Sequence, residues 1–497
     1  MMEKGESLVL PNQQIVGMFA DKHQIAHLDI RSLSVMRLCF GAIYLWTNLE
    51  RLTRVTAHYS DRGIWPRSKI AEASLLYNPW AFISPHLFSG NWLLEFALFL
   101  VSALIGLFLF LGFKTKWVTP ICWFLECSAQ MRNPLVTSAG DAAFRLVLFW
   151  TMFLPWGDRF SVDSRGQKPG PNTLKSWWGV GYMVQVTAIY FFAGWAKTGP
   201  EWTRDGTAAS LVLSHELFTT SFGSTLLQFP RFLEISAYVT VWFERLVVLF
   251  FWSPWWTDLT RSTAIISAMI LHIGMGLSMH LGALPWIFVS ALIGLVPTAV
   301  WQLILGSSSD LDRLESSSLF RIPLPKLYLS ALAPALLIGS TLAYNIALPL
   351  RIIRDPLRLV GKWADLKQSW VMYAPSPTNR NGWFVFPGTL SDGRKIDLFQ
   401  GGTALSWEKP KSLSPVYRGA AWSNYFEHTV YWHAEREPQK YYQDFAKYIC
   451  RTWNRDHPDG MRLSSLEFVY VLTPTSSERR SSEKQILSLW KQDCGSE

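Results

Sequence analysis

Residues 92–113, WLLEFALFLVSALIGLFLFLGF, form an apolar run long enough to cross a lipid bilayer as a helix. Similar runs recur through the first 349 residues, at about 33–49, 117–131, 141–156, 176–196, 233–253, 263–281, 283–305 and 327–349. Two of them, 117–131 and 141–156, are short and interrupted by polar residues. The pattern predicts a mainly α-helical, polytopic membrane bundle with roughly eight or nine spans.

Aromatic composition agrees with a membrane location. The chain holds 26 Trp, 31 Phe and 16 Tyr, and its mean hydropathy of +0.13 is high for an ordinary soluble enzyme. Tryptophans gather at the ends of the apolar runs, as in interfacial belts: Trp46, Trp92, Trp117, Trp156, Trp177, Trp178, Trp195, Trp202, Trp255 and Trp256. Aromatic residues could also hold a flat apolar ligand such as a quinone, although interface anchoring and helix packing account for most of them.

Charged residues become more frequent near position 350, which marks a domain boundary. We expect an N-terminal segment (1–32), a transmembrane domain (33–349), a soluble outer domain (350–474) and a polar tail (475–497). In the outer domain, strands are predicted at 382–386, 395–399 and 466–472, and a helix at 441–453. This pattern is typical of an α+β or β-rich domain.

Basic residues predict the orientation of the bundle. They concentrate in alternate short loops, which favours a cytoplasmic N-terminus and places the C-terminal domain on the outer side. No cleavable signal peptide is visible, so the first apolar run would act as an uncleaved anchor. The net charge of +9 comes from scattered residues, many of them flanking apolar runs, and does not favour nucleic-acid binding.

The five cysteines form no CxxC motif and no Cys/His cluster, so a zinc or iron–sulfur site is not expected. Cys450 and Cys494 could form a disulfide if the C-terminal domain faces an oxidising compartment. The sequence equally allows both residues to be free thiols.

A lysine, Lys197, ends the apolar stretch IYFFAGWAK at residues 189–197. An ammonium group that loses solvation gives up its proton more readily, and a neutral amine can act as a base. The simpler alternative is an interfacial lysine whose side chain extends to the lipid headgroups.

Several other charged or titratable residues lie within apolar runs, where their burial is costly: Arg37, Glu126, Asp141, Arg145, Glu244, Arg245, His272 and His280. Asp141 and Arg145 are four residues apart, so a structural ion pair is favoured. Glu244 could orient a catalytic group, or pair with Arg37 or Arg245. His272 could be a base, but a hydrogen bond between helices is the more common role.

Four motifs, in order, resemble the HTTM-type membrane domain that occurs in vitamin K-dependent gamma-carboxylase. The first is Asp61 to Arg67, DRGIWPR; the second contains MRNP at 131–134, then Asp141, Arg145 and SVD at 161–163. The third is YFFAGWAK at 190–197, followed by Glu201 and Trp202, and the fourth is the helix containing His272. The resemblance covers roughly residues 28–305.

The resemblance implies a chemistry. In that family a deprotonated lysine takes a proton from reduced vitamin K, which reacts with O2 to give an epoxide. A strong base formed on the way removes a glutamate γ-proton, and the carbanion captures CO2. By this resemblance Lys197 would be the base and Glu244 and His272 supporting catalytic groups. The quinol would contact Tyr190, Phe191, Trp195 and Trp202.

The sequence departs from the family pattern at one place, and this limits the activity that we expect. The carboxylase has an Asn-His pair in the loop that corresponds to residues 131–141, whereas Asn133 here is followed by Pro134. A quinol epoxidase or oxygenase is therefore favoured over a complete carboxylase-like lyase. The expected partners are membrane lipid, the quinol and a peptide or protein substrate at the outer face.

Two other functions stay open. The chain could be a non-enzymatic membrane factor for peptide maturation or secretion, with the outer domain as the peptide-binding part. A transporter or lipid-binding protein is less favoured, because no inverted repeat is visible. In the segment that leads into the outer domain, Ser376, Arg380 and Trp383 could contact a ligand. Docking of the domain through Trp370 and Tyr373 is the preferred reading.

Overall fold

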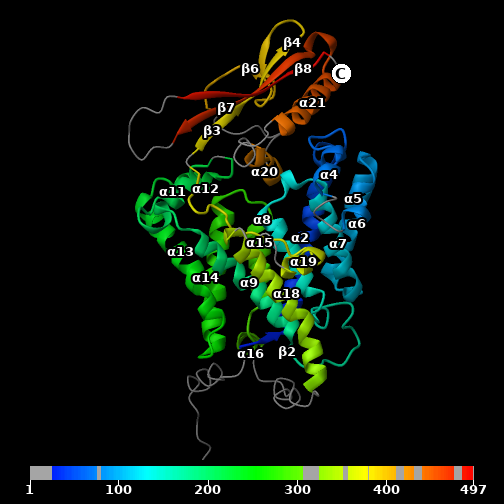
Figure 1. The fold of residues 1–497 in the computed structure, drawn as a ribbon, viewed down its shortest axis with the longest axis vertical. Coiled ribbons are helices and arrows are strands. Elements are labelled where there is room, and N and C mark those ends of the chain that lie inside the picture. The colour runs from blue at the N-terminus through cyan, green and yellow to red at the C-terminus, as the bar shows by residue number, and fades with distance from the viewer. Residues whose placement is uncertain are drawn as a thin grey trace, which may run out of the picture.

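The computed structural model describes residues 25–74, 80–215, 217–305, 324–350, 356–378, 380–409, 419–429, 439–474 and 484–495. It shows an elongated helical body whose one end is covered by a C-terminal sheet (Figure 1). The expected fold class is confirmed to this extent: the protein is mainly helical, with a C-terminal β-sheet region.

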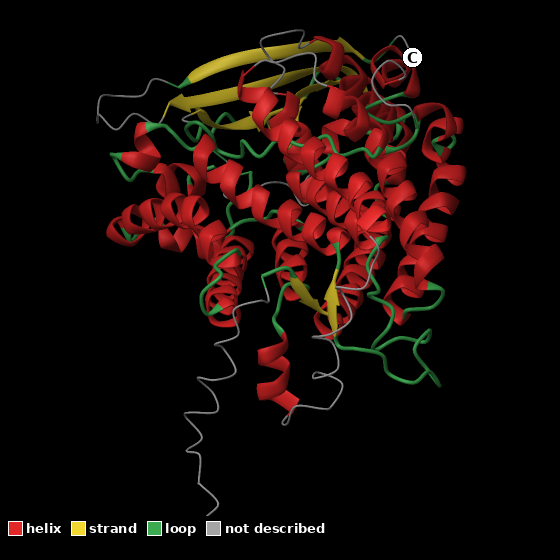
Figure 2. Ribbon diagram, turned by 60° about the horizontal axis from the view of Figure 1, so that its bottom comes forward, coloured by secondary structure: helices red, strands yellow, loops and turns green. Residues whose placement is uncertain are grey.

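Long helices make up the helical body: α2 (Ile30–Leu52), α6 (Trp92–Leu111), α7 (Thr115–Arg132), α8 (Ala139–Thr151), α9 (Trp177–Ala196), α13 (Pro230–Phe251), α14 (Thr257–Ser278), α15 (Leu284–Ile293), α16 (Thr298–Leu305) and α18 (Leu324–Leu350). Short helices join them: α3 (Val55–His58), α4 (Arg67–Ser74), η1 (Ala81–Ile83), α5 (Pro85–Phe88), η2 (Pro134–Val136), α10 (Pro200–Thr203), α11 (Ala208–Leu213), α12 (Ser221–Leu226) and α19 (Pro356–Trp363). A two-stranded pair, β1 (His27–Asp29) and β2 (Thr173–Lys175), lies at the end opposite the sheet (Figure 2).

Within the described ranges, α6 alone is long and apolar enough to cross a membrane as one helix. A second crossing results if α15 and α16, which meet at a bend of 82°, are taken together. Helix α13 is long enough, but it is less apolar because it carries four charged residues: Arg231, Glu234, Glu244 and Arg245. The expectation of eight or nine spans therefore stays a prediction.

Large apolar side chains are nevertheless exposed along several helices. Those on α6, α13 and α14 follow helical spacing: Leu93, Leu100, Leu104, Phe232, Ile235, Val239, Leu249, Ile266, Ile270 and Leu277. Soluble monomers rarely expose contiguous apolar patches of this kind. These surfaces favour helices that face lipid.

The C-terminal sheet is antiparallel, with strand order β3-β7-β4-β5-β6, and β8 pairs with β7. Its strands are β3 (Arg380–Val385), β4 (Pro387–Leu390), β5 (Lys395–Asp397), β6 (Thr403–Ala404), β7 (Leu463–Pro474) and β8 (Gln485–Asp493). The sequence-predicted strands correspond to β3, β5 and β7. The predicted helix corresponds to α21 (Gln439–Asp456), which is followed by η6 (Asp459–Met461).

One segment differs from the sequence-based expectation. Strand β8 lies in the range assigned to a polar tail, yet it pairs with β7 along most of its length. A disulfide between Cys450 of α21 and Cys494 holds the end of this strand. The expectation failed because β8 is an edge strand with exposed residues on both faces, so it lacks the apolar alternation of a half-buried strand.

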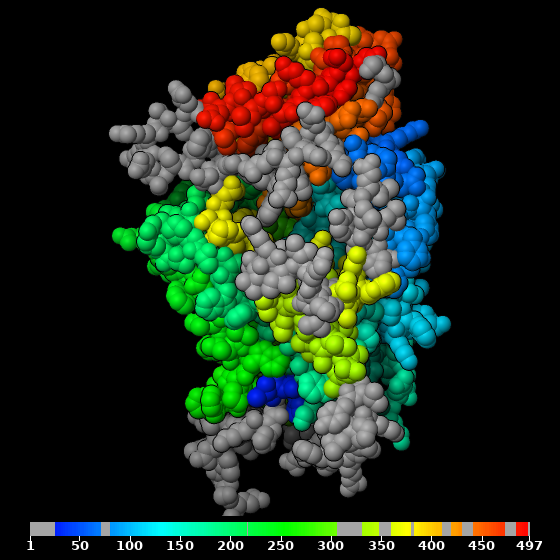
Figure 3. All heavy atoms as spheres, in the orientation of Figure 1, coloured from blue at the N-terminus to red at the C-terminus, as the bar shows by residue number. Residues whose placement is uncertain are grey.

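Helix α20 (Ala420–Glu427) docks the C-terminal domain onto the helical body. Its Ser423 hydroxyl donates to the Leu217 carbonyl at 3.0 Å, and the Asn424 amide donates to the Val136 carbonyl at 3.3 Å. The Trp422 ring lies against the His58 ring, with centroids 4.4 Å apart. The two parts therefore share a continuous interface, and Figure 3 shows the C-terminal strands covering one end of the body.

Candidate functional site

Lys197 lies directly after α9 and is buried, with 4% of its surface exposed. Its Nζ is 2.6 Å from Glu244 Oε2 on α13, and the two side chains are 5% and 13% exposed. Nζ also donates to the Ala193 carbonyl at 3.3 Å. The lysine is thus a buried, paired group and does not extend to the protein surface as an interfacial anchor would.

Close packing of α9 against α13 brings this pair together. A Cβ atom on Gly194 would lie 2.8 Å from both the Arg245 backbone nitrogen and Glu244 Cβ, so only glycine fits there. Arg245 donates through Nε to the Gly194 carbonyl at 3.0 Å and through Nη2 to the Lys197 carbonyl at 2.8 Å. It thereby satisfies carbonyl groups left open at the end of α9.

These contacts decide between the partners that the sequence left open for Glu244. Arg245 caps α9, and its guanidinium lies 5.2 Å from the ring centroids of both Trp195 and Trp242. Arg37 lies elsewhere, where it donates to backbone carbonyls including those of Leu109 and Trp156. The expectation that Glu244 pairs with Arg37 or Arg245 is therefore wrong, since the close approach of α9 and α13 gives it Lys197.

The four aromatic residues expected to contact a quinol fall into two groups. Trp202 is buried, and its ring centroid is 5.4 Å from Lys197 Nζ. Tyr190 is also buried. Trp195 is 53% exposed, and the partly buried Phe191 lies beside it at 6.1 Å between ring centroids. Tyr190 and Trp202 therefore belong to the interior around α9, whereas Trp195 and Phe191 contribute to its outer surface.

Among the described residues, His272 on α14 forms its hydrogen bond with Tyr190 and not with Lys197. The Tyr190 hydroxyl and His272 Nε2 are 2.8 Å apart, and the imidazole stacks on Phe288 at 4.4 Å. His272 Nδ1 is buried and has no hydrogen-bond partner among the described residues. Tyr190 precedes Lys197 by about two helical turns, a rise of roughly 10 Å, so His272 contacts α9 well before the lysine.

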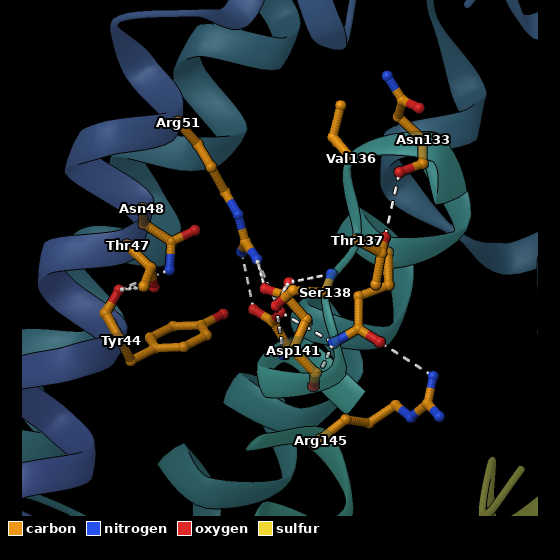
Figure 4. A network of polar contacts seen from close by, with 12 residues as sticks. Tyr44, Thr47, Asn48, Arg51, Asn133, Val136, Thr137, Ser138, Asp141 and Arg145 are labelled. Atoms are coloured by element: carbon orange, nitrogen blue, oxygen red, sulfur yellow. Dashed lines mark hydrogen bonds and ion pairs between the residues drawn. The ribbon is translucent and has the colours of Figure 1, made fainter. Parts of the chain in front are cut away.

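A second polar cluster joins α2, α7 and α8 within the helical body (Figure 4). Arg51 donates to both carboxylate oxygens of Glu126 at 2.8 Å and to Asp141 at 3.2 Å. Asp141 also forms a capping box with Ser138 at the start of α8. Arg51 is a cluster residue that sequence reasoning missed; its only signal is its position just after the first apolar run.

The predicted ion pair between Asp141 and Arg145 is wrong. Arg145 instead donates to Gln130 at 2.9 Å and lies 3.4 Å from Asp365. The spacing of four residues permits the pair, but the capping box turns the Asp141 carboxylate toward the helix N-terminus and Arg51.

A cavity of about 70 Å³ adjoins this cluster and is closed on one side by Ala420 and Asn424 of α20. His58 lines it, is 1% exposed, and has no partner for either ring nitrogen among the described residues. Burial, with Arg54 nearby, lowers the pKa of His58 to about 3. Sequence reasoning also missed this histidine, because nothing around it in the chain marks it as buried.

Fold and site together define a helical protein that has lipid-compatible outer faces and a buried lysine–glutamate pair. A family model described as the HTTM domain matches residues 26–301, more than half of the chain, so the protein belongs to the HTTM domain family. This family is membrane-associated, and its domain is found in vitamin K-dependent carboxylase-type proteins. No curated protein and no solved structure matches the chain.

Proposed function

We propose that this protein is an integral membrane quinol epoxidase, or oxygenase, in which Lys197 is the base. The observation that carries the proposal is the buried ion pair between Lys197 and Glu244, 2.6 Å apart, beside the Trp202 ring. A lysine and a glutamate held this way can share one proton. Transfer from the ammonium to the carboxylate leaves an amine and a carboxylic acid, both uncharged, and a dry site favours uncharged groups.

The proposed proton path uses only these residues. Glu244 accepts the Lys197 proton, and the free amine then takes a proton from a hydroxyl group of the quinol. The quinol supplies the electrons that reduce O2. One oxygen atom enters the quinone ring as an epoxide and the other leaves as water, so that quinol and O2 give quinone epoxide and water. Trp202 covers the lysine and limits the access of water.

We place the polar end of the quinol beside Tyr190, where buried aromatic residues line the interior. Tyr190, His272 and Phe288 form a buried aromatic group in which His272 Nδ1 lacks a partner within the described ranges. A quinol oxygen could satisfy this nitrogen, since buried polar atoms are rarely left unpaired. The adjoining rings supply an apolar wall for the quinone nucleus.

The proposed reaction ends with the formation of the quinone epoxide. Asn133 donates its amide hydrogen to the His58 carbonyl at 2.7 Å and accepts from the Leu135 backbone N–H at 3.1 Å. The amide nitrogen and the amide oxygen of Asn133 are therefore both used in hydrogen bonds that fix the backbone around this loop. No histidine follows Asn133 in the chain as it does in the carboxylase, so glutamate carboxylation with CO2 is not part of the proposed activity.

The test is quinol turnover by the purified full-length protein in detergent, under oxygen, with menaquinol or phylloquinol as substrate. We expect epoxide from the wild type and from Lys175→Met, which removes an exposed lysine on β2, and none from Lys197→Met. Absence of epoxide from the wild type with both quinols, or equal yields from wild type and Lys197→Met, would overturn the proposal.

We place the protein across the membrane with its N-terminus in the cytoplasm and its C-terminal domain on the outer side. The disulfide between Cys450 and Cys494 supports this orientation, since disulfides persist in oxidising compartments. Modification by a membrane-impermeant thiol reagent tests the orientation in intact cells. Because Cys450 and Cys494 are both buried, the reporter is a cysteine introduced at the exposed Ile486 of β8, which should react from outside.

A second candidate function is peptide binding during maturation or secretion, and β8 favours it. Within the described part of the sheet, β8 pairs only with β7, and its Ile486 and Leu487 are 58% and 41% exposed. An edge strand of this kind can accept an extended peptide as a further strand. Co-purification of one defined peptide that is lost in an Ile486→Pro variant would favour this function over the enzyme.

A further inference from the structure

A segment far from Lys197 in the chain contacts the loop that carries it. The Tyr373 carbonyl accepts the Trp202 indole N–H at 2.9 Å, and the Pro375 carbonyl accepts the Gly199 backbone N–H at 3.0 Å. The Ser376 hydroxyl donates to Glu201 Oε2 at 2.6 Å. Three hydrogen bonds therefore join four consecutive residues to the five that follow Lys197.

The same segment is anchored at its other end on the body of α9. Gln368 accepts from the Gln185 amide at 2.9 Å and from the Trp370 indole N–H at 2.8 Å. Trp370 is buried, and its ring lies 6.4 Å from that of Phe288, which stacks on His272. We call residues 368–376 the linker segment; it runs alongside α9 from Gln185 to the loop after Lys197.

The fit at the lysine end is tight. A Cβ on Gly199 would lie 1.9 Å from Ser376 Oγ and 2.8 Å from the Pro375 carbonyl oxygen, so only glycine leaves room for this contact. Tyr373 adopts a left-handed backbone conformation with φ of 55°, which is unfavourable for a bulky residue. A strained conformation persists only where surrounding contacts hold it, and such positions gather at functional sites.

We propose that the linker segment is a positioning element for Lys197, so that the chain leading into the C-terminal domain completes the lysine site. By fixing Trp202 over the amine, Tyr373 sets how far Lys197 is shielded, and Ser376 holds the loop through Glu201. This inference deepens the proposed function, since the group being positioned is the proposed base. Its test below does not require turnover.

The experiment measures acylation of Lys197 by an amine-reactive anhydride in the purified full-length protein, at several pH values, with peptide mass spectrometry as readout. The exposed Lys175 in the same molecule is the internal reference. Loss of one hydrogen bond at the loop should raise the Lys197 to Lys175 labelling ratio about fivefold in Ser376→Ala and in Trp202→Phe. Trp202→Phe keeps an aromatic ring but removes the indole N–H.

Two controls separate positioning from general loosening. Ser376→Thr keeps the hydroxyl and should label like the wild type. Ser391→Ala removes a hydroxyl from a distant turn of the outer domain, where it donates to the Asp459 carbonyl, and should also leave the ratio unchanged. An unchanged ratio in both Ser376→Ala and Trp202→Phe, or an equal rise in Ser391→Ala, would overturn the inference.

The outcomes distinguish this inference from the proposed function. A raised labelling ratio without any epoxide from the wild type supports the positioning role and removes the epoxidase. Epoxide from the wild type with unchanged labelling in both variants keeps the enzyme and removes the role of the linker segment.

Discussion

Glu244→Gln tests the buried ion pair most sharply, because it keeps the shape of the side chain and removes its charge. In the wild type, the Lys197 and Glu244 side chains are 5% and 13% exposed and the N–O distance is 2.6 Å. After the substitution, Lys197 retains the Ala193 carbonyl at 3.3 Å and the Trp202 ring. Neither of these carries a negative charge.

Removing one partner of a buried pair typically costs about 3–5 kcal/mol, because a charge is left without compensation. The glutamine amide oxygen can still accept one hydrogen bond, so we expect the lower end, about 3 kcal/mol at pH 7. That is a large share of the roughly 5–15 kcal/mol that stabilises a typical native domain.

The assay is denaturant unfolding of the full chain in mixed micelles at pH 7. The double variant Lys197→Met/Glu244→Gln is the matched control, because two uncharged side chains of similar volume leave no buried charge. It should recover most of the stability lost in Glu244→Gln. A Glu244→Gln protein within about 0.5 kcal/mol of the wild type would refute the reasoning, as would a double variant as unstable as the single one.

Three further predictions concern the C-terminal domain and the residues that it covers. The folded pKa of His58, about 3, lies below the ordinary value of 6.5, so its contribution to stability is present above pH 6.5 and lost as pH falls. The free energy of unfolding should fall less steeply on acidification in His58→Phe than in the wild type. The difference in slope should be about 1.4 kcal/mol per pH unit between pH 6.5 and 4, as measured by unfolding titrations. Burial raises the pKa of Glu427 to about 7, so its protonated form stabilises the fold at low pH and stability is lost as pH rises toward 7. Glu427→Gln should therefore be about 2–3 kcal/mol more stable than wild type at pH 8 and equal to it at pH 4. Cys450→Ser opens a disulfide loop with a sequence separation of 44 and should cost about 4 kcal/mol by loop entropy, with thermal melting of the C-terminal domain as the readout.

Sequence patterns identified the residues of the site more readily than their partners. Lys197 and Glu244 stand out because charges inside apolar runs are costly. Their pairing could not be predicted, since it depends on how closely α9 and α13 approach at Gly194. The same limit applies to His272, whose bond to Tyr190 joins residues 82 positions apart.

The spacing of residues along the sequence gave a wrong prediction where another local interaction competed with the expected one. Asp141 and Arg145 have the spacing of a helical ion pair, but the capping box with Ser138 draws the carboxylate away. Strand β8 escaped prediction because an edge strand needs a partner, here β7, and owes little to its own apolar pattern. Such outcomes depend on tertiary contacts that single-sequence patterns do not contain.

We propose that Lys197 is the base of an oxygen-using quinol reaction. The most direct measurement is turnover of menaquinol under ¹⁸O₂ by the wild type and by Lys197→Met, with mass analysis of the quinone product. We expect the wild type to give a quinone epoxide that carries one ¹⁸O atom from the epoxidation step, and the variant to give no epoxide. Unlabelled quinone alone from the wild type, or labelled epoxide from both proteins, would contradict it.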